Sequence, residues 1–195
     1  LNPNGAYSPY PENVSQRALD IIIKHTKELI PYAENAGIVI CPETTKWTVV
    51  NKIERMKQFV ERIDSPYVRI TFDPVNHMTA DRLYESGVYT RQAISYLGDC
   101  IGSIHCKDVM VSDTKLVVHL DECLIGDGVF DYEPLLEMSK TLDPWKTFTV
   151  EHVWEREWVR STFEKLQVVS DRIGHFWTDS SLTRQKWLLA NNIYS

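Results

Sequence analysis

Four short apolar runs alternate along the chain with longer amphipathic stretches, and each run is followed at once by polar or charged residues. Their length, their β-branched content and the turn residues that flank them are typical of buried strands in a parallel sheet. Strands are therefore predicted over Ile38–Cys41, Tyr67–Phe72, Ile101–His105 and Thr147–Val150.

Apolar residues at a helical spacing fill most of the stretches outside these runs. Ser15 is a plausible N-cap for the first helix, Gly37 suits the left-handed position after it, and Ser181 caps the last helix. Helices are predicted over Ala18–Asn35, Val49–Ile63, Ala80–Leu97 with a break at Gly87, Tyr132–Lys140, Trp158–Ile173 and Leu182 to Asn191.

The order strand, loop, helix repeats four times. Crossovers of this length impose parallel strands and a right-handed wind, so the fold class is α/β. Both an open doubly wound sheet and part of a (β/α)₈ barrel satisfy the pattern. Lys115–Leu120 alternates like a hairpin arm, and Gly126–Gly128 predicts a tight turn. No glycine-rich phosphate loop follows any predicted strand, which disfavours nucleotide binding.

Composition narrows the class of protein. A chain of 195 residues predicts one domain, and a net charge of −6 disfavours general nucleic-acid binding. We expect no signal peptide, and no apolar run approaches the roughly 18 residues of a membrane span. The cysteines form no C-x-x-C pair and indicate reduced thiols in a cytoplasmic protein. They are Cys41, Cys100, Cys106 and Cys123.

Metal-binding side chains stand at the carboxyl ends of all four predicted strands: Glu43, Asp73, His105 and Glu151. In a parallel α/β sheet these ends converge on one edge. Three carboxylates at close range would repel one another, and a divalent cation removes that conflict. Three oxygen donors and one imidazole suit Mn²⁺, Mg²⁺ or Co²⁺ better than a closed, sulfur-rich zinc site.

Polar residues beside these strand ends are candidate substrate contacts. Asn76 and His77 follow Asp73, Lys107 and Asp108 follow His105, and His119 lies on the predicted hairpin arm. The competing interpretation makes Lys107 and Asp108 a loop ion pair and the others solvated loop or core residues.

The aromatic residues near the last strand have two interpretations as well. Trp154, Trp158 and Trp187 are expected to pack in the core, although a tryptophan near a strand end can stack on a sugar ring. His152, directly after Glu151, is expected to form a local hydrogen bond.

Taken together, these motifs resemble the sugar phosphate isomerase/epimerase superfamily, the xylose isomerase-like TIM barrels. The resemblance extends from about Ala6 to Ile173. The matching pieces are a strand followed by glutamate, Asp-Pro-x-Asn, His-x-Lys-Asp, Gly-x-Gly-x-x-Asp-Tyr and Val-Glu. They lie at Ile38–Glu43, Asp73–Asn76, His105–Asp108, Gly126–Tyr132 and Val150–Glu151.

The resemblance implies a TIM (β/α)₈ barrel of the xylose isomerase-like type, of which the chain corresponds to the C-terminal four β/α units. Residues 1–16 would form an N-terminal loop, 17–178 the four units and 179–195 a C-terminal helix, within a single domain 1–195. By the same resemblance the four strand-end residues would be the metal ligands, with Mn²⁺ as the preferred ion and Mg²⁺, Co²⁺ or Zn²⁺ as alternatives.

The implied function is a metal-dependent isomerase or epimerase of a sugar, sugar phosphate or polyol. Glu43 and Glu151 would remove and return a proton next to a metal-chelated carbonyl. The alternatives are an inosose dehydratase-like lyase, a non-catalytic degenerate half-barrel used for binding or assembly, and, last, an endonuclease IV-like phosphodiesterase. The expected partner is a small carbohydrate, with homo-oligomer formation left open.

Overall fold

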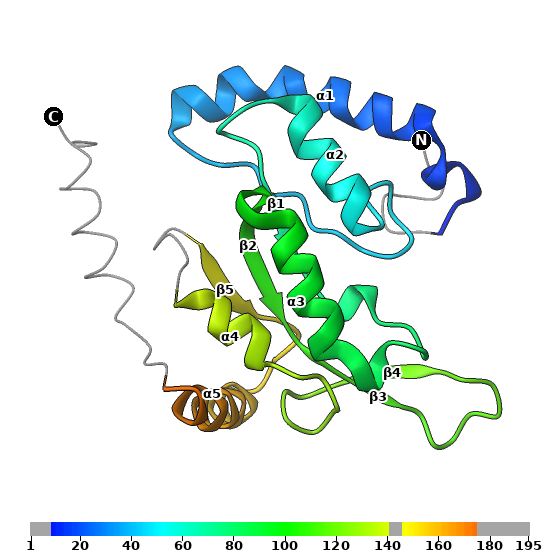
Figure 1. Ribbon diagram of the computed structural model, residues 1–195, viewed down its shortest axis with the longest axis vertical. Coiled ribbons are helices and arrows are strands. Elements are labelled where there is room, and N and C mark those ends of the chain that lie inside the picture. Colours follow the sequence, from blue (N-terminus) through cyan, green and yellow to red (C-terminus); the bar gives the residue numbers. More distant parts are fainter. Residues whose placement is uncertain (1–8, 141–145, 175–195) are drawn as a thin grey trace, which may run out of the picture. The chain divides into compact units, whose positions relative to one another are not determined.

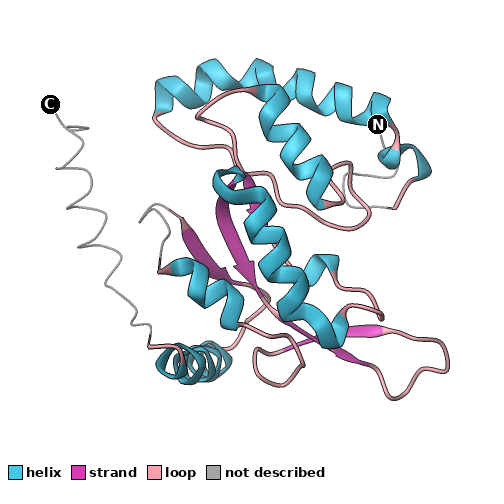
Figure 2. Ribbon diagram, in the orientation of Figure 1, coloured by secondary structure: helices cyan, strands magenta, loops and turns pink. Residues whose placement is uncertain are grey.

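The computed structural model describes residues 9–140 and 146–174 of the chain. It contains five α-helices and five strands in this part of the chain, with three of the strands following one another directly (Figure 1), and the strands are short compared with the helices (Figure 2). The chain divides into two compact units, which are described one at a time. One contains Leu1–Met78 and Gln92–His105, and the other contains Thr79–Arg91 and Cys106–Ser195.

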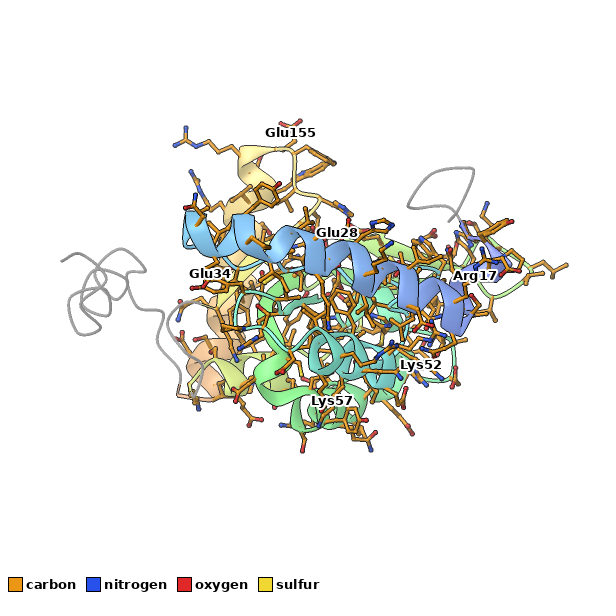
Figure 3. The ribbon with its side chains drawn as sticks, turned by 90° about the horizontal axis from the view of Figure 1, so that it is seen from above. Arg17, Glu28, Glu34, Lys52, Lys57 and Glu155 are labelled. Carbon is orange, nitrogen blue, oxygen red and sulfur yellow. The ribbon has the colours of Figure 1, made fainter. Side chains whose placement is uncertain are left out.

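The first unit opens with the 3₁₀ turn η1 (Pro11–Val14) and the long helix α1 (Gln16–Ala36). The predicted N-cap is confirmed, because the Ser15 hydroxyl accepts a hydrogen bond from the Ala18 amide at 3.1 Å. Gly37 ends the helix with a φ of 63°, the left-handed conformation that glycine adopts without a Cβ clash. The face of α1 that carries Arg17, Glu28 and Glu34 is exposed (Figure 3).

Helix α2 (Ile53–Ile63) packs beside α1. Its fully buried residues Met56 and Phe59 follow the helical repeat and form the centre of this unit's core with Leu19 of α1. The helix predicted from Val49 begins four residues later, at Ile53. Val49 and Val50 are buried in a bend instead, and they are β-branched residues that tolerate an extended backbone well.

Strand β1 (Ile70–Phe72) pairs in parallel with β2 (Ile101–Cys106). The predicted strand Ile38–Cys41 is only partly confirmed, since it is reduced to a single parallel bridge between Ile40 and Val68, and Ile38 and Val39 are 56% and 50% exposed. Within this run the backbone bonds to the neighbouring segment are confined to Ile40, whose amide donates to the Tyr67 carbonyl and whose carbonyl accepts from the Arg69 amide.

The second unit carries an antiparallel hairpin of β3 (Asp108–Val111) and β4 (Leu120–Cys123). The hairpin arm predicted over Lys115–Leu120 is misplaced, because residues 115–119 belong to the exposed tip and only Leu120 belongs to an arm. Leu116 and Val117 are 104% and 79% exposed, so alternation there marks side chains in solvent rather than a half-buried strand.

Helix α4 (Glu133–Ser139) and helix α5 (Arg156–Arg172) pack against each other in this unit through the buried residues Leu135, Leu136 and Leu166. Strand β5 (Thr147–Val150) has the predicted bounds. Helix α3 (Ser86–Leu97) starts one residue before the predicted break at Gly87. The predicted helix from Leu182 lies outside the described residues. The remaining 3₁₀ turns are η2 (Val75–His77), η3 (Leu83–Glu85) and η4 (Gly98–Cys100).

Among the helices in the described part of the chain, none is both long enough and apolar enough to cross a membrane.

Candidate metal centre

Three candidate ligands of the first unit come together where neighbouring parallel segments end. Asp73 follows β1 directly, His105 lies at the end of β2, and Glu43 forms a parallel bridge with Thr71. One ligand atom from each of Glu43, Asp73 and His105 lies within 4.8 Å of the others. The prediction that these strand ends converge is therefore confirmed for the three residues of this unit.

Glu43 is held in place by two neighbours. Its Oε1 accepts a hydrogen bond from Asn76 Nδ2 at 2.9 Å and lies 3.3 Å from His105 Nδ1. The Glu43 and His105 side chains are 26% and 19% exposed, so both can still be reached from solvent. Asn76, predicted as a substrate contact, thus orients a candidate ligand.

Asp73 connects the strand to the turn that carries Asn76. Its Oδ1 accepts a hydrogen bond from the Asn76 amide at 3.1 Å, which is the local pattern by which aspartate stabilises a turn. The side chain is fully buried. Asp73 therefore fixes the backbone that places the Asn76 amide group on Glu43.

His77, also predicted as a substrate contact, is fully buried and stacks on Phe72 with ring centroids 6.5 Å apart. Its Nε2 lies 3.1 Å from Thr44 Oγ1, and that hydroxyl donates to the Thr71 carbonyl at 3.2 Å. Since the hydroxyl has one hydrogen, it accepts from His77, and Nε2 carries the proton. His77 and Thr44 thus form a buried hydrogen-bonded pair next in the chain to Glu43 and Asn76, and no sequence pattern indicated a role for Thr44.

Glu151, the fourth predicted ligand, belongs to the second unit. It follows β5 directly, and its amide donates to the Cys106 carbonyl at 3.0 Å. Its Oε2 accepts from Lys107 Nζ at 3.1 Å, in an ion pair whose side chains are only 6% and 19% exposed. The Tyr132 hydroxyl donates to the Lys107 carbonyl, so the lysine is fixed at its backbone as well.

Asp108, the next predicted substrate contact, is almost fully buried and accepts from four backbone amides. Oδ1 accepts from Val109 at 2.8 Å and Phe130 at 3.0 Å, while Oδ2 accepts from Gly126 at 2.8 Å and Gly128 at 3.3 Å. This arrangement stabilises the Gly126–Gly128 turn, and the sequence prediction of a turn there is confirmed.

His119 lies on the hairpin tip. Its Nε2 is 3.1 Å from Asp121 Oδ1, and both side chains are about half exposed, which describes an ordinary surface ion pair. Cys123, at the end of β4, carries a protonated thiol at neutral pH, because burial raises its pKa to about 11 and the nearby Asp108 adds to the shift.

The donor set of the first unit fits a divalent cation. Two carboxylates and one imidazole are the hard oxygen and borderline nitrogen donors that Mn²⁺, Mg²⁺ and Zn²⁺ accept in proteins. The amide of Asn76 behind Glu43 is the kind of outer hydrogen bond that orients a metal-binding carboxylate.

Comparison with known proteins places the fold. A family model described as xylose isomerase-like TIM barrel matches residues 2–174. A search of curated protein sequences finds no match.

Among solved structures, similar ones include a xylose isomerase domain protein from Planctomyces limnophilus, at 24% identity and a TM-score of 0.62. Another is a xylose isomerase-like TIM barrel protein from Mycobacterium smegmatis in complex with magnesium, at 16% identity and a TM-score of 0.60. A third is 3-keto-D-glucoside 4-epimerase from E. coli, at 17% identity and a TM-score of 0.53.

The matched structures cover 84%, 84% and 83% of this chain. The chain in turn spans 56%, 58% and 58% of their own lengths. At these identities the likeness establishes a shared fold.

Proposed function

Because the chain belongs to the xylose isomerase-like TIM barrel family, we propose that it provides the divalent metal centre of a sugar isomerase or epimerase. The observation that carries this proposal is the convergence of Glu43, Asp73 and His105 within 4.8 Å. Each of the three comes from the end of a different parallel segment, and this is the edge of an α/β sheet where ligands bind.

Glu151 is proposed as the fourth ligand. It follows strand β5 as Asp73 follows β1, and its carboxylate is held by Lys107 in a largely buried pair. A buried carboxylate needs a positive partner, which Lys107 supplies on one side and a cation can supply on the other. Manganese is the preferred ion by donor chemistry, with Mg²⁺, Co²⁺ and Zn²⁺ as alternatives.

A bound divalent ion would polarise a substrate carbonyl and so acidify the adjacent C–H bond. Glu43 and Glu151 are the proposed bases that remove and return the proton. Asn76 keeps the Glu43 carboxylate in one orientation, and Lys107 does the same for Glu151. Lys107 is also a proposed hydrogen-bond donor to a substrate oxygen.

The proposed substrate is a carbohydrate or polyol that carries a carbonyl next to a hydroxyl-bearing carbon. Isomerisation, epimerisation and dehydration share the same first proton removal, so this site chemistry accommodates all three.

The test combines metal affinity with proton exchange. Mn²⁺ binding to the full chain is measured by titration calorimetry, and exchange of solvent deuterium into a panel of ketoses is followed by NMR. Glu43→Gln keeps one oxygen donor but removes the base, so exchange should fall by about 10²–10⁴-fold while metal affinity changes less. Asp73→Asn should instead weaken metal binding, and excess metal should partly restore exchange.

Glu34→Gln is the matched control, since Glu34 is exposed on α1 of the same unit (Figure 3). It should leave both metal affinity and exchange unchanged. If Asp73→Asn binds Mn²⁺ as tightly as the parent chain does and Glu43→Gln exchanges deuterium at the parent rate, the proposal fails.

A further inference from the structure

The second unit contains a cleft, and most of its lining residues have no role in the metal chemistry described above. The cleft has a volume of about 300 Å³, and its lining includes Lys107, Glu122, Glu151, Trp154 and Trp158. It lies between the end of β4, the end of β5 and the first turn of α5.

Two tryptophans in this lining are far more exposed than packing would make them. Trp154 is 80% exposed and Trp158 is 41% exposed. The expectation that Trp154 packs in the core is therefore wrong. Large aromatic surface left in contact with water at the side of a cleft is a common sign of a binding site.

The backbone after β5 is shaped to present these rings. His152 has a φ of 55°, a left-handed conformation that is unfavourable for a residue with a Cβ. Its Nδ1 pairs with Glu122 of β4, and its ring stacks on Trp154 with centroids 6.3 Å apart and planes 13° from parallel. The His152 ring thus covers one face of the Trp154 indole and restricts its orientation.

The charges in the cleft point to a neutral ligand. The Lys107 ammonium is already paired with Glu151, and Glu122 adds a second carboxylate. A phosphate or carboxylate entering here would have to displace Glu151 from Lys107 and lie beside Glu122. Cys123, another lining residue, has a protonated thiol and provides no anionic nucleophile.

We propose that this cleft binds an uncharged sugar ring, as a subsite for a glycosyl group that the substrate carries beyond its reacting carbonyl. A pyranose has a face of weakly positive C–H groups that complements the negative face of an indole. Its hydroxyl edge complements the carboxylate of Glu122 and the imidazole of His152. The proposal rests on the proposed function for the link between this ring and the reacting group, because Glu151 lines the cleft.

The test follows the indole N–H signals of the six tryptophans by NMR in the ¹⁵N-labelled full chain. Trp154 and Trp158 are assigned by their phenylalanine variants. Methyl β-D-glucopyranoside is titrated with Mg²⁺ and again with EDTA, and glucose 6-phosphate is titrated in parallel. We expect the glycoside to shift both indoles saturably and to bind more tightly than the phosphate.

Trp154→Ala should weaken glycoside binding at least about tenfold, and because the residue is exposed this variant should fold. His152→Gly keeps the left-handed backbone accessible but removes the ring behind Trp154, so binding should weaken without loss of stability. Trp47→Ala is the matched control, since Trp47 is 43% exposed in the other unit and should have no effect.

Two results would overturn the proposal: neither indole responds to the glycoside, or glucose 6-phosphate binds more tightly than the glycoside. The metal readout separates it from the proposed function. If the chain binds Mg²⁺ while the two indoles do not respond to the glycoside, the proposed sugar subsite is refuted and the proposed metal centre is supported. If the chain binds the glycoside at Trp154 but binds no metal, the sugar subsite is supported and the proposed metal centre is refuted.

Discussion

Replacing Asp108 by asparagine tests whether this residue stabilises the fold of the second unit or contacts substrate. The aspartate is 1% exposed and accepts hydrogen bonds from four backbone amides. Asparagine has nearly the same shape but offers one oxygen and an NH₂ group. Its oxygen can still accept the hydrogen bonds from the amides of Val109 and Phe130. Its NH₂ group then faces the amides of Gly126 and Gly128 and cannot accept from them.

The expected loss of stability follows from these contacts. The 2.8 Å bond from Gly126 to a charged oxygen contributes about 1.5–3 kcal/mol, and the 3.3 Å bond from Gly128 contributes less. Leaving donors without an acceptor adds about 1–3 kcal/mol. We therefore expect Asp108→Asn to lower the free energy of unfolding by about 3–5 kcal/mol, from the lost hydrogen bonds and the unpaired donors together.

The measurement is urea unfolding followed by tryptophan fluorescence, supported by hydrogen exchange of the Gly126 and Phe130 amides. Asp127→Asn is the control from the same turn, because its pair with Lys165 is largely exposed and should contribute only about 0–1 kcal/mol. If the two variants are equally stable within about 1 kcal/mol, the four-amide arrangement does not stabilise the fold as argued.

Two further predictions concern other groups. Asn76→Ala removes the amide that holds Glu43 and should weaken Mn²⁺ binding about 10–100-fold without unfolding the chain, measured by calorimetry and circular dichroism; an unchanged affinity would contradict the role given to Asn76. Cys123, with a pKa of about 11, should react with iodoacetamide at pH 7.5 roughly 300-fold more slowly than a free thiol does, and the rate should rise about tenfold per pH unit up to pH 11. Mass spectrometry of the labelled peptide gives the rate, and a plateau below pH 9 would refute the assignment.

The sequence predicted the positions of the candidate ligands better than it predicted their surroundings. Asp73 and His105 were identified because each follows or ends a short apolar run. Such a run is a local signal for a strand and can be recognised without knowing which residues it contacts. The partners of those residues are contacts across long sequence distances. Nothing in the sequence near Asn76 indicates that its amide group reaches Glu43, because that contact depends on how two loops pack.

The errors have physical causes of the same kind. Ile38 and Val39 were predicted as buried because they are apolar, yet burial depends on what covers a segment. Trp154 was assigned to the core for the same reason. The left-handed backbone of His152 was not predicted, because histidine adopts that conformation only occasionally and the contact with Glu122 lies far away in the sequence.

The attachment of the β3–β4 hairpin has a consequence for how relatives of this chain can diverge. Its base is tied to the Gly126–Gly128 turn by Asp108, while residues 112–119 at its tip form no strand. Insertions, deletions and substitutions in the tip can therefore accumulate without disturbing the base. Glu122 and Cys123 line the cleft from that base. The length and the side chains of the tip can therefore vary among relatives while these two residues keep their places in the cleft.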